Sequence, residues 1–276
     1  MLAMSKKKVM LEKKYRKYVI LCAVAAVVII GGVMIRNSFA EFEYEGLSDK
    51  ADYPAAEYDM NKFYQNKHNM RAYKDGIRKS RSGIDVSVHQ HNIDWEKVKK
   101  SGVEFAMIRL GYSDNAEGNI YMDEKFEDNI KEAKKAGIDV GVYFFSQATN
   151  SDEAVTEAEY VLKHIKHKGV TMPVAFDMEP INEYDRISDL SMVEKTEIAD
   201  AFCQVIKRQG YDPVIYGNPW WINKSLDLSY LTDYDIWLAH YDVATDFPWH
   251  FKMWQYTDQG IIDGIDGPVD LDVYFK

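Results

Sequence analysis

The alternation of short apolar segments with longer amphipathic ones, from Gly83 to the end of the chain, restricts the fold more than any other feature. Short apolar runs predict buried strands, and segments with apolar residues three or four positions apart predict helices that cover those strands. We expect strands at 84–88, 105–110, 139–145, 174–177, 214–216, 236–240, 252–256 and 269–273, and helices at 95–101, 124–136, 152–166 and 192–209.

Eight strands with helices in the first gaps predict an α/β fold, and within that class a β/α barrel. The starts of the last strands lie only roughly 16 to 22 residues apart, whereas a strand–helix–strand unit needs about 30 residues. We therefore expect a shortened, irregular barrel at 83–276 in which loops link the last three strands. An open, doubly wound sheet is the alternative, but no glycine-rich phosphate loop follows the first strand.

The N-terminal region combines basic and apolar segments in the order typical of a membrane protein. Residues 1–36 contain eight Lys or Arg and one Glu, and an apolar run of 17 residues at 19–35 follows most of the basic residues. Such a run is at the lower limit for a spanning helix, and the basic residues before it place the N-terminus in the cytoplasm. We expect a basic cytoplasmic segment at 1–17 and a single transmembrane anchor at 18–36, with the later residues outside the membrane. Cleavage of a signal peptide near Ala40 is the alternative.

Residues 37–82 show no sustained hydrophobic period and are predicted to form an extracytoplasmic spacer. A short helix at 58–73 fits the pattern, and a small packed subdomain is a second alternative. Residues 37–276 carry a net charge of −17, which argues against nucleic acid as a partner. No cluster of Cys and His has the spacing of a metal site, so we expect no metal and no cofactor.

Two carboxylates, Asp177 and Glu179, end the apolar run within residues 173–180. Residues i and i+2 of a strand point to the same face, with Cα atoms roughly 6.6 Å apart. Because burial and mutual repulsion both disfavour the charged forms, we expect one of the two to hold its proton near neutral pH. A proton donor beside an ionised carboxylate is the arrangement that acid-catalysed glycoside cleavage requires. The plainer alternative is a strand that ends in two solvated acids.

Other polar and aromatic residues fall where the predicted strands end, which in β/α barrels is the functional face. Carboxylates, amides and aromatic rings in one place suit a carbohydrate, since rings stack on sugar faces and amides bind hydroxyl and acetamido groups. Trp237 and Tyr143 are equally well explained as core residues, and Asp85 as an ion-pair partner of Arg109. The candidates are Asp85, Arg109, Tyr143, Tyr216, Asn218, Trp237, Tyr241, Gln255, Asp270 and Asp272.

Eight short segments carry a family resemblance when they are taken in series, although each is weak alone. They follow one another over about 190 residues, in a fixed order and spacing. The segments are Gly83-Ile-Asp-Val-Ser-Val-His-Gln90, Phe105-Ala-Met-Ile-Arg-Leu-Gly-Tyr112, Ala136-Gly-Ile-Asp-Val-Gly-Val-Tyr143, Pro173-Val-Ala-Phe-Asp-Met-Glu179, Val214-Ile-Tyr-Gly-Asn218, Ile236-Trp-Leu-Ala-His-Tyr241, Met253-Trp-Gln-Tyr256 and Gly267-Pro-Val-Asp-Leu-Asp272.

The body of the chain thereby resembles glycoside hydrolase family 25, the muramidases also called Chalaropsis-type lysozymes. The resemblance implies hydrolysis of the β-1,4 bond between N-acetylmuramic acid and N-acetylglucosamine in peptidoglycan. It also implies a barrel of about five βα units and three further strands. A catalytically silent peptidoglycan-binding module held at the membrane, and a hydrolase of chitin-like glycans, are the alternatives.

The resemblance also implies roles for individual residues. Glu179 stands at the general acid and Asp177 at its partner carboxylate, while Asp85 and Asp270 stand at the first and the C-terminal essential acids. Many members have Asn where this chain has Asp272. We expect Asp177 to orient the substrate's N-acetyl group, which would attack the anomeric carbon while Glu179 protonates the leaving oxygen. Arg109, Tyr143, Tyr216, Asn218, Trp237, Tyr241, Gln255 and Asp272 are the predicted substrate-binding residues.

Overall fold

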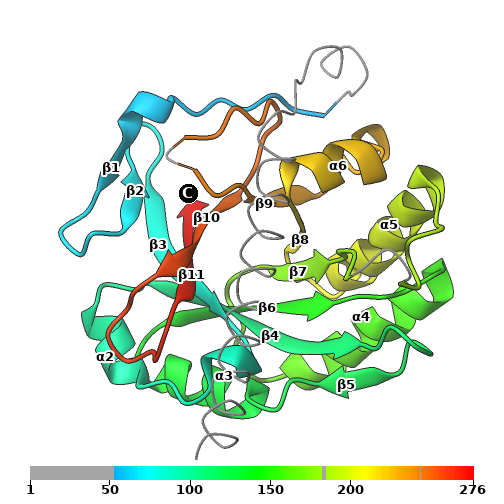
Figure 1. Cartoon of the computed structure of the whole chain (residues 1–276), viewed down its shortest axis with the longest axis horizontal. Coiled ribbons are helices and arrows are strands. Elements are labelled where there is room, and N and C mark those ends of the chain that lie inside the picture. Colours follow the sequence, from blue (N-terminus) through cyan, green and yellow to red (C-terminus); the bar gives the residue numbers. More distant parts are fainter. Residues whose placement is uncertain (1–52, 182–184, 243) are drawn as a thin grey trace, which may run out of the picture. The chain divides into compact units, whose positions relative to one another are not determined.

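The computed structural model describes residues 53–181, 185–242 and 244–276 (Figure 1). The expected cytoplasmic segment, the expected membrane anchor and residues 37–52 of the expected spacer lie outside these residues. Within the described ranges, no helix is long and apolar enough to cross a membrane.

Eight strands close into a barrel, and all eight strands predicted from the sequence are present. The order around the barrel is β3, β4, β6, β7, β8, β9, β10 and β11, and β3 pairs with both β4 and β11. The closed ring excludes the open, doubly wound sheet. The bounds are β3 (Ser80–Val86), β4 (Phe105–Ser113), β6 (Asp139–Phe145), β7 (Val174–Asp177), β8 (Pro213–Gly217), β9 (Asp235–Ala239), β10 (Met253–Gly260) and β11 (Val269–Phe275).

The barrel is irregular at its last strand, because β11 runs antiparallel to both of its neighbours while the other strands run parallel. A hairpin joins β10 to β11, so no crossover helix is needed there. The short spacing in the sequence is thus explained: loops, a short α6 (Pro219–Ser225) and the 3₁₀ turn η3 (Leu228–Tyr230) replace full helices.

Helices cover the parallel part of the barrel (Figure 1). A capping box begins the longest helix: Ser191 accepts from the backbone N–H of Glu194, and the Glu194 side chain accepts in return from the Ser191 N–H. The same helix buries Phe202 against Phe176 of β7, with ring centroids 5.1 Å apart. The remaining bounds are α2 (Trp95–Lys100), α3 (Phe126–Lys135), α4 (Ser151–Ile165), α5 (Met192–Arg208) and the 3₁₀ turn η2 (Val88–Gln90).

The barrel interior is apolar at one end and acidic at the other. Alternate residues of each strand point inward, so Phe105 and Met107 on β4 pack in a layer below Arg109. Gly83 makes this packing possible, because a Cβ there would lie 2.4 Å from the Phe105 ring. The buried layer consists of Phe105, Met107, Met172, Ala175, Val214, Tyr216, Trp237, Ala239 and Met253.

Residues 53–82 are packed against the barrel, where a loose spacer was expected. The strands β1 (Phe63–Gln65) and β2 (Arg71–Tyr73) form a hairpin after the 3₁₀ turn η1 (Met60–Lys62), so the predicted helix at 58–73 was wrong. Turn chemistry explains the difference: the Asn66 side chain accepts from the backbone N–H groups of His68 and Met70, and Asn69 is left-handed with φ 58°. Such a turn reverses the chain within the span that a helix would occupy.

Aromatic rings attach this hairpin to the barrel. Tyr73 is 1% exposed, and its ring contacts Phe63, Tyr58 and Phe275 of β11 at centroid distances of 4.8 to 5.8 Å. Tyr58 donates a hydrogen bond of 2.6 Å to the carbonyl of Phe251. The packed domain therefore begins near Tyr53 rather than at residue 83.

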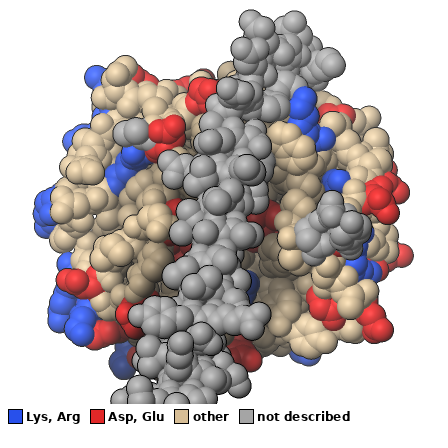
Figure 2. Space-filling view, viewed as in Figure 1, with Lys and Arg blue, Asp and Glu red and all other residues tan. Residues whose placement is uncertain are grey.

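In the view of Figure 2, acidic and basic side chains of the described residues are interspersed over the surface. On this face the Asp and Glu side chains do not gather into one patch. The β5 strand (Ile120–Met122), which the sequence did not predict, pairs antiparallel with the end of β4. It extends the sheet beyond the barrel at the acidic end.

Replacing Tyr73 with Ala tests whether residues 53–82 belong to the folded domain. We expect Tyr73→Ala to lower the free energy of unfolding by about 3–5 kcal/mol, because a fully buried ring is removed. Tyr64, on the same hairpin but 50% exposed, is the control, and Tyr64→Ala is expected to cost under about 0.5 kcal/mol. Urea denaturation measures both. Equal, small losses would show that the hairpin is a loose tether.

Candidate active site

The predicted acids meet at one end of the barrel, where the parallel strands terminate. Asp85 lies on β3 directly opposite Asp270 on β11, as Cα partners of the antiparallel pairing. Asp177 is the last residue of β7, and Glu179 follows two positions later. Because β11 is reversed, its first residues lie beside the last residues of β3. The reversal brings acids from the two ends of the domain together.

Asp85 and Asp272 form a buried carboxyl pair. Their exposed fractions are 6% and 0%, and their side chains are hydrogen-bonded to each other. Burial raises the pKa of both well above the usual range, and the negative charge of Asp270 raises both further. A hydrogen bond between two carboxyl groups requires a proton on one of them. The pair therefore holds a proton where isolated acids would be fully ionised.

Gln255 on β10 orients Asp85. Its Nε2 donates to Asp85 Oδ2 at 2.7 Å, while its Oε1 accepts from the hydroxyls of Tyr216 and Tyr241 at 2.9 and 2.8 Å. The two hydroxyl donors fix which end of the amide faces the acid. On the other side, the indole N–H of Trp237 donates to Asp272 Oδ1 at 2.8 Å. Each member of the carboxyl pair is thus held by a neutral donor.

Asp177 and Glu179 form the second acidic pair. Burial raises the pKa of Glu179 to about 7. Burial and the adjacent Glu179 also raise the pKa of Asp177, whereas the Arg109 guanidinium opposes that rise. Burial and Glu179 together outweigh Arg109, so the pKa of Asp177 stays well above its usual range. Asp177 Oδ1 is buried and has no hydrogen-bond partner among the described residues, so it is an available acceptor.

Asp270 is the more accessible of the two C-terminal acids. It is half-buried, and burial together with the charge of Asp258 raises its pKa to about 6. Asp272 is fully buried beneath it. The geometry thus separates their positions: Asp270 faces the open end of the barrel, and Asp272 lies below it against Trp237.

Several predicted substrate-binding residues lie elsewhere than expected. Trp237 is 1% exposed and sits in the core below Asp272, which leaves its ring no face for a sugar. Asn218 caps α6 by accepting from the backbone N–H of Trp221 at 2.8 Å. Tyr143 is half-buried, with its ring edge-on to Trp237. Tyr241, which is 50% exposed, is the predicted aromatic residue with the most accessible ring.

Arg109 pairs with Asp123 rather than with Asp85, the partner weighed from the sequence. Arg109 Nε donates to Asp123 Oδ2 at 2.8 Å, and the same oxygen accepts from the backbone N–H of Val88. Asp123 is buried and holds the guanidinium near Asp177. Sequence reasoning missed Asp123, because it follows β5, a three-residue strand too short to produce an alternating pattern. No group of three His, Cys, Asp or Glu suited to a metal ion occurs in the described ranges.

A β/α barrel with paired carboxyl groups of unequal proton affinity at its strand ends is the site of a glycoside hydrolase. The family model for glycosyl hydrolases family 25 matches residues 84–265, and the chain belongs to this family.

Relatives of known name support this membership. The chain is 30% identical over 195 residues to an autolytic lysozyme from Clostridium acetobutylicum, covering 70% of this chain and 55% of the relative. It is 31% identical over 200 residues to lysozyme M1 from Streptomyces globisporus, covering 68% and 65%. The structure of the modular autolysin LytC from Streptococcus pneumoniae, solved with a synthetic peptidoglycan ligand, superposes with a TM-score of 0.64 at 25% identity. That match covers 77% of this chain and 52% of LytC, so this chain spans about half the length of that protein.

The buried carboxyl pair makes a prediction for stability. Since Asp272 holds its proton to a higher pH in the folded than in the unfolded chain, the folded state binds more protons between the two pKa values. Stability therefore falls as pH rises through that window, starting near the unfolded pKa of about 3.9. Asp272→Asn removes this titration while keeping an acceptor for Trp237 and a donor for Asp85.

We expect the free energy of unfolding of Asp272→Asn to fall less between pH 4 and pH 8 than that of the wild type. Urea unfolding at a series of pH values measures both slopes. Parallel pH profiles would contradict a raised pKa at Asp272.

Proposed function

We propose that the protein is a peptidoglycan muramidase that hydrolyses the β-1,4 bond between N-acetylmuramic acid and N-acetylglucosamine. The observation that carries the proposal is the Asp177–Glu179 pair, in which burial keeps a proton on Glu179 up to about neutral pH. Relatives named lysozyme and the peptidoglycan ligand of LytC support the choice of substrate.

In the proposed mechanism Glu179 donates its proton to the glycosidic oxygen as the bond to the anomeric carbon breaks. The carbonyl oxygen of the substrate's 2-acetamido group attacks that carbon and forms a cyclic intermediate. Asp177 accepts a hydrogen bond from the acetamido N–H through its unpartnered Oδ1 and stabilises the developing positive charge. Water, deprotonated by Glu179, then opens the ring and restores the acetamido group. A glycosyl ester trapped on any carboxylate would contradict this route.

The other site residues act on this pair or on the sugar. Arg109, held by Asp123, opposes the rise in the pKa of Asp177 that burial and Glu179 cause. Asp270 and the exposed ring of Tyr241 present a carboxylate and an aromatic face at the same end of the barrel. Gln255 accepts a hydrogen bond from the Tyr241 hydroxyl and donates one to Asp85. The Tyr241 hydroxyl is therefore linked through Gln255 to the buried carboxyl pair.

We further propose that residues 18–36 anchor the enzyme in the cell membrane, with the N-terminus in the cytoplasm and the barrel outside. The basic residues before the apolar run support this orientation. An anchored muramidase would cut peptidoglycan close to the producing cell, for local remodelling of the wall. Fractionation of cells producing the full chain decides between anchoring and release, and a shortened product in the medium would show cleavage near Ala40.

Mass spectrometry of digested peptidoglycan tests the proposed bond specificity. We expect the wild type to release fragments with N-acetylmuramic acid at the new reducing end, and Glu179→Gln to be slower by at least about 100-fold, because a general acid contributes 10²–10⁴-fold. Circular dichroism checks that the variant is folded. Binding without cleavage by the wild type would favour the silent module. Cleavage of chitin oligomers in preference to peptidoglycan would favour the second alternative.

The pKa of Glu179 sets the upper pH limit of activity. Because the acid must be protonated to donate, kcat/KM is expected to fall tenfold per pH unit above about pH 7. Initial rates of peptidoglycan hydrolysis between pH 4 and pH 9 measure this limb. A rate that stays constant to pH 9 would contradict the assignment of Glu179 as the proton donor.

A further inference from the structure

A further buried acid, Glu157 on α4, takes no part in the proposed mechanism. It is 2% exposed, and each of its carboxylate oxygens accepts one short hydrogen bond. Ser113 Oγ, at the end of β4, donates to Oε1 at 2.6 Å, and Ser146 Oγ, directly after β6, donates to Oε2 at 2.6 Å. One carboxylate therefore joins the ends of two neighbouring barrel strands.

The direction of these hydrogen bonds is fixed by further partners. Ser113 Oγ accepts from the backbone N–H of Gln147 at 2.7 Å, and Ser146 Oγ accepts from that of Ala148 at 3.1 Å. Since each serine oxygen already faces a donor, each hydroxyl hydrogen is directed to Glu157. The position requires two acceptor atoms, which an ionised carboxylate provides, and the two serine hydroxyls oppose the burial that raises the pKa of Glu157 to about 7.

Ser146 and Gln147, which follow β6, hold the backbone of Asp177 and Glu179. Gln147 Nε2 donates to the carbonyl oxygen of Glu179 at 3.0 Å. The backbone N–H of Ser146 donates to the carbonyl oxygen of Asp177 at 2.7 Å. Gln147 and Ser146 are both 0% exposed. The carbonyls of Asp177 and Glu179 thus rest on residues that Glu157 positions.

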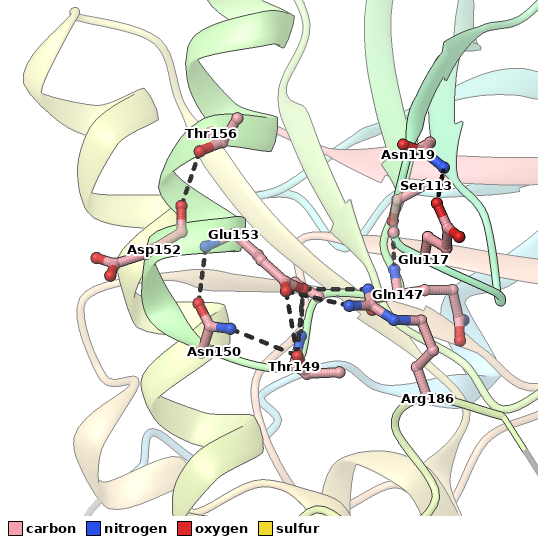
Figure 3. A network of polar contacts seen from close by, with 12 residues as sticks. Ser113, Glu117, Asn119, Gln147, Thr149, Asn150, Asp152, Glu153, Thr156 and Arg186 are labelled. Atoms are coloured by element: carbon pink, nitrogen blue, oxygen red, sulfur yellow. Dashed lines mark hydrogen bonds and ion pairs between the residues drawn. The ribbon is translucent and has the colours of Figure 1, made fainter.

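The turn between β6 and α4, which contains Gln147, is also held by an ion pair on its other side. Figure 3 shows Arg186 between Gln147 and Glu153: its guanidinium donates to the Gln147 carbonyl at 2.7 Å and to both Glu153 oxygens at 3.1 Å. Glu153 also accepts from the backbone N–H of Thr149 at 2.9 Å. The turn between β6 and α4 is therefore held from outside by an ion pair and from inside by Glu157.

We propose that Glu157 is a positioning residue for Glu179, acting through Ser113, Ser146 and Gln147 without touching substrate. The assignment of a catalytic role to Glu179 rests on the proposed function, whereas the mechanical link rests on the hydrogen bonds alone. Loss of the link lets Glu179 shift and admits water to its carboxyl group. Both changes are measurable separately.

Glu157→Gln in the full chain tests the proposal. Glutamine offers one acceptor and one donor, so one of the two serine hydroxyls loses its acceptor. We expect kcat to fall about 10- to 100-fold with KM within about twofold, since a displacement of about 1 Å can cost 10²-fold in rate. The pKa of Glu179 should fall from about 7 toward its ordinary value as water reaches it.

Steady-state kinetics and the pKa of Glu179 are measured separately, so that the outcomes can be distinguished. The pKa of Glu179 is followed by ¹³C NMR of carboxyl-labelled glutamate, with the signal assigned by its absence from Glu179→Gln. This readout needs no turnover, so it tests the link even if the protein does not cleave peptidoglycan. An unchanged Glu179 pKa in Glu157→Gln would overturn the proposal, whatever the wild type does to substrate.

Thr196→Val is the matched control for stability. Thr196 is 5% exposed, donates to the Met192 carbonyl at 2.7 Å and accepts from the Asp227 N–H at 2.9 Å, all outside the catalytic segment. We expect it to lower stability while leaving kcat and the Glu179 pKa unchanged. If Glu157→Gln does not fold, Ser113→Ala and Ser146→Ala each remove one donor and are expected to lower kcat and the Glu179 pKa in the same direction. Wild-type values in both serine variants would contradict the link.

Discussion

The burial of carboxyl groups at the open end of the barrel is the constraint on which the rest of the site depends. Removing an acid from water disfavours its charged form, so each buried acid either holds a proton or has dedicated donors. Asp85 and Asp272 hold a proton between them, while Gln255 and Trp237 donate to their outer oxygens. Glu157 accepts from two serine hydroxyls, which lower its pKa, but burial still raises that pKa to about 7. Burial raises the pKa of Glu179 to about 7 as well.

The reversed β11 strand determines which acids meet. A parallel final strand would place its C-terminal end at the acidic face and leave Asp270 and Asp272 nearer the opposite end. The antiparallel hairpin from β10 places Asp270 directly beside Asp85 and lets Gln255 pair with Asp272 across the ladder. The antiparallel last strand therefore shortens the barrel and also brings the acids of β3 and β11 together.

The sequence predicted the barrel well because strand and helix periods are local properties. All eight barrel strands and four helices were located from apolar spacing. The Asp-x-Glu pair was also visible, since its spacing on a strand is fixed by backbone geometry. The hairpin at 63–73 was missed because its strands have three residues each, and its turn depends on one Asn66 side chain.

Contacts between distant segments escaped the sequence for a different reason. Trp237 was assigned to the sugar, yet its position on β9 places it in the buried layer, and only the register with β11 shows its bond to Asp272. Asp123 and Glu157 carry no local motif. Their importance lies in partners 14 to 44 residues away, Arg109 and Ser113.

The proposed mechanism depends on the proton that burial places on Glu179 at neutral pH. The most direct measurement is a carboxyl ¹³C NMR titration of the wild type with the Glu179 signal assigned. We expect a pKa of about 7. A value near 4.3, that of a solvated glutamate, would show that Glu179 is ionised when the enzyme works and would contradict its role as the proton donor.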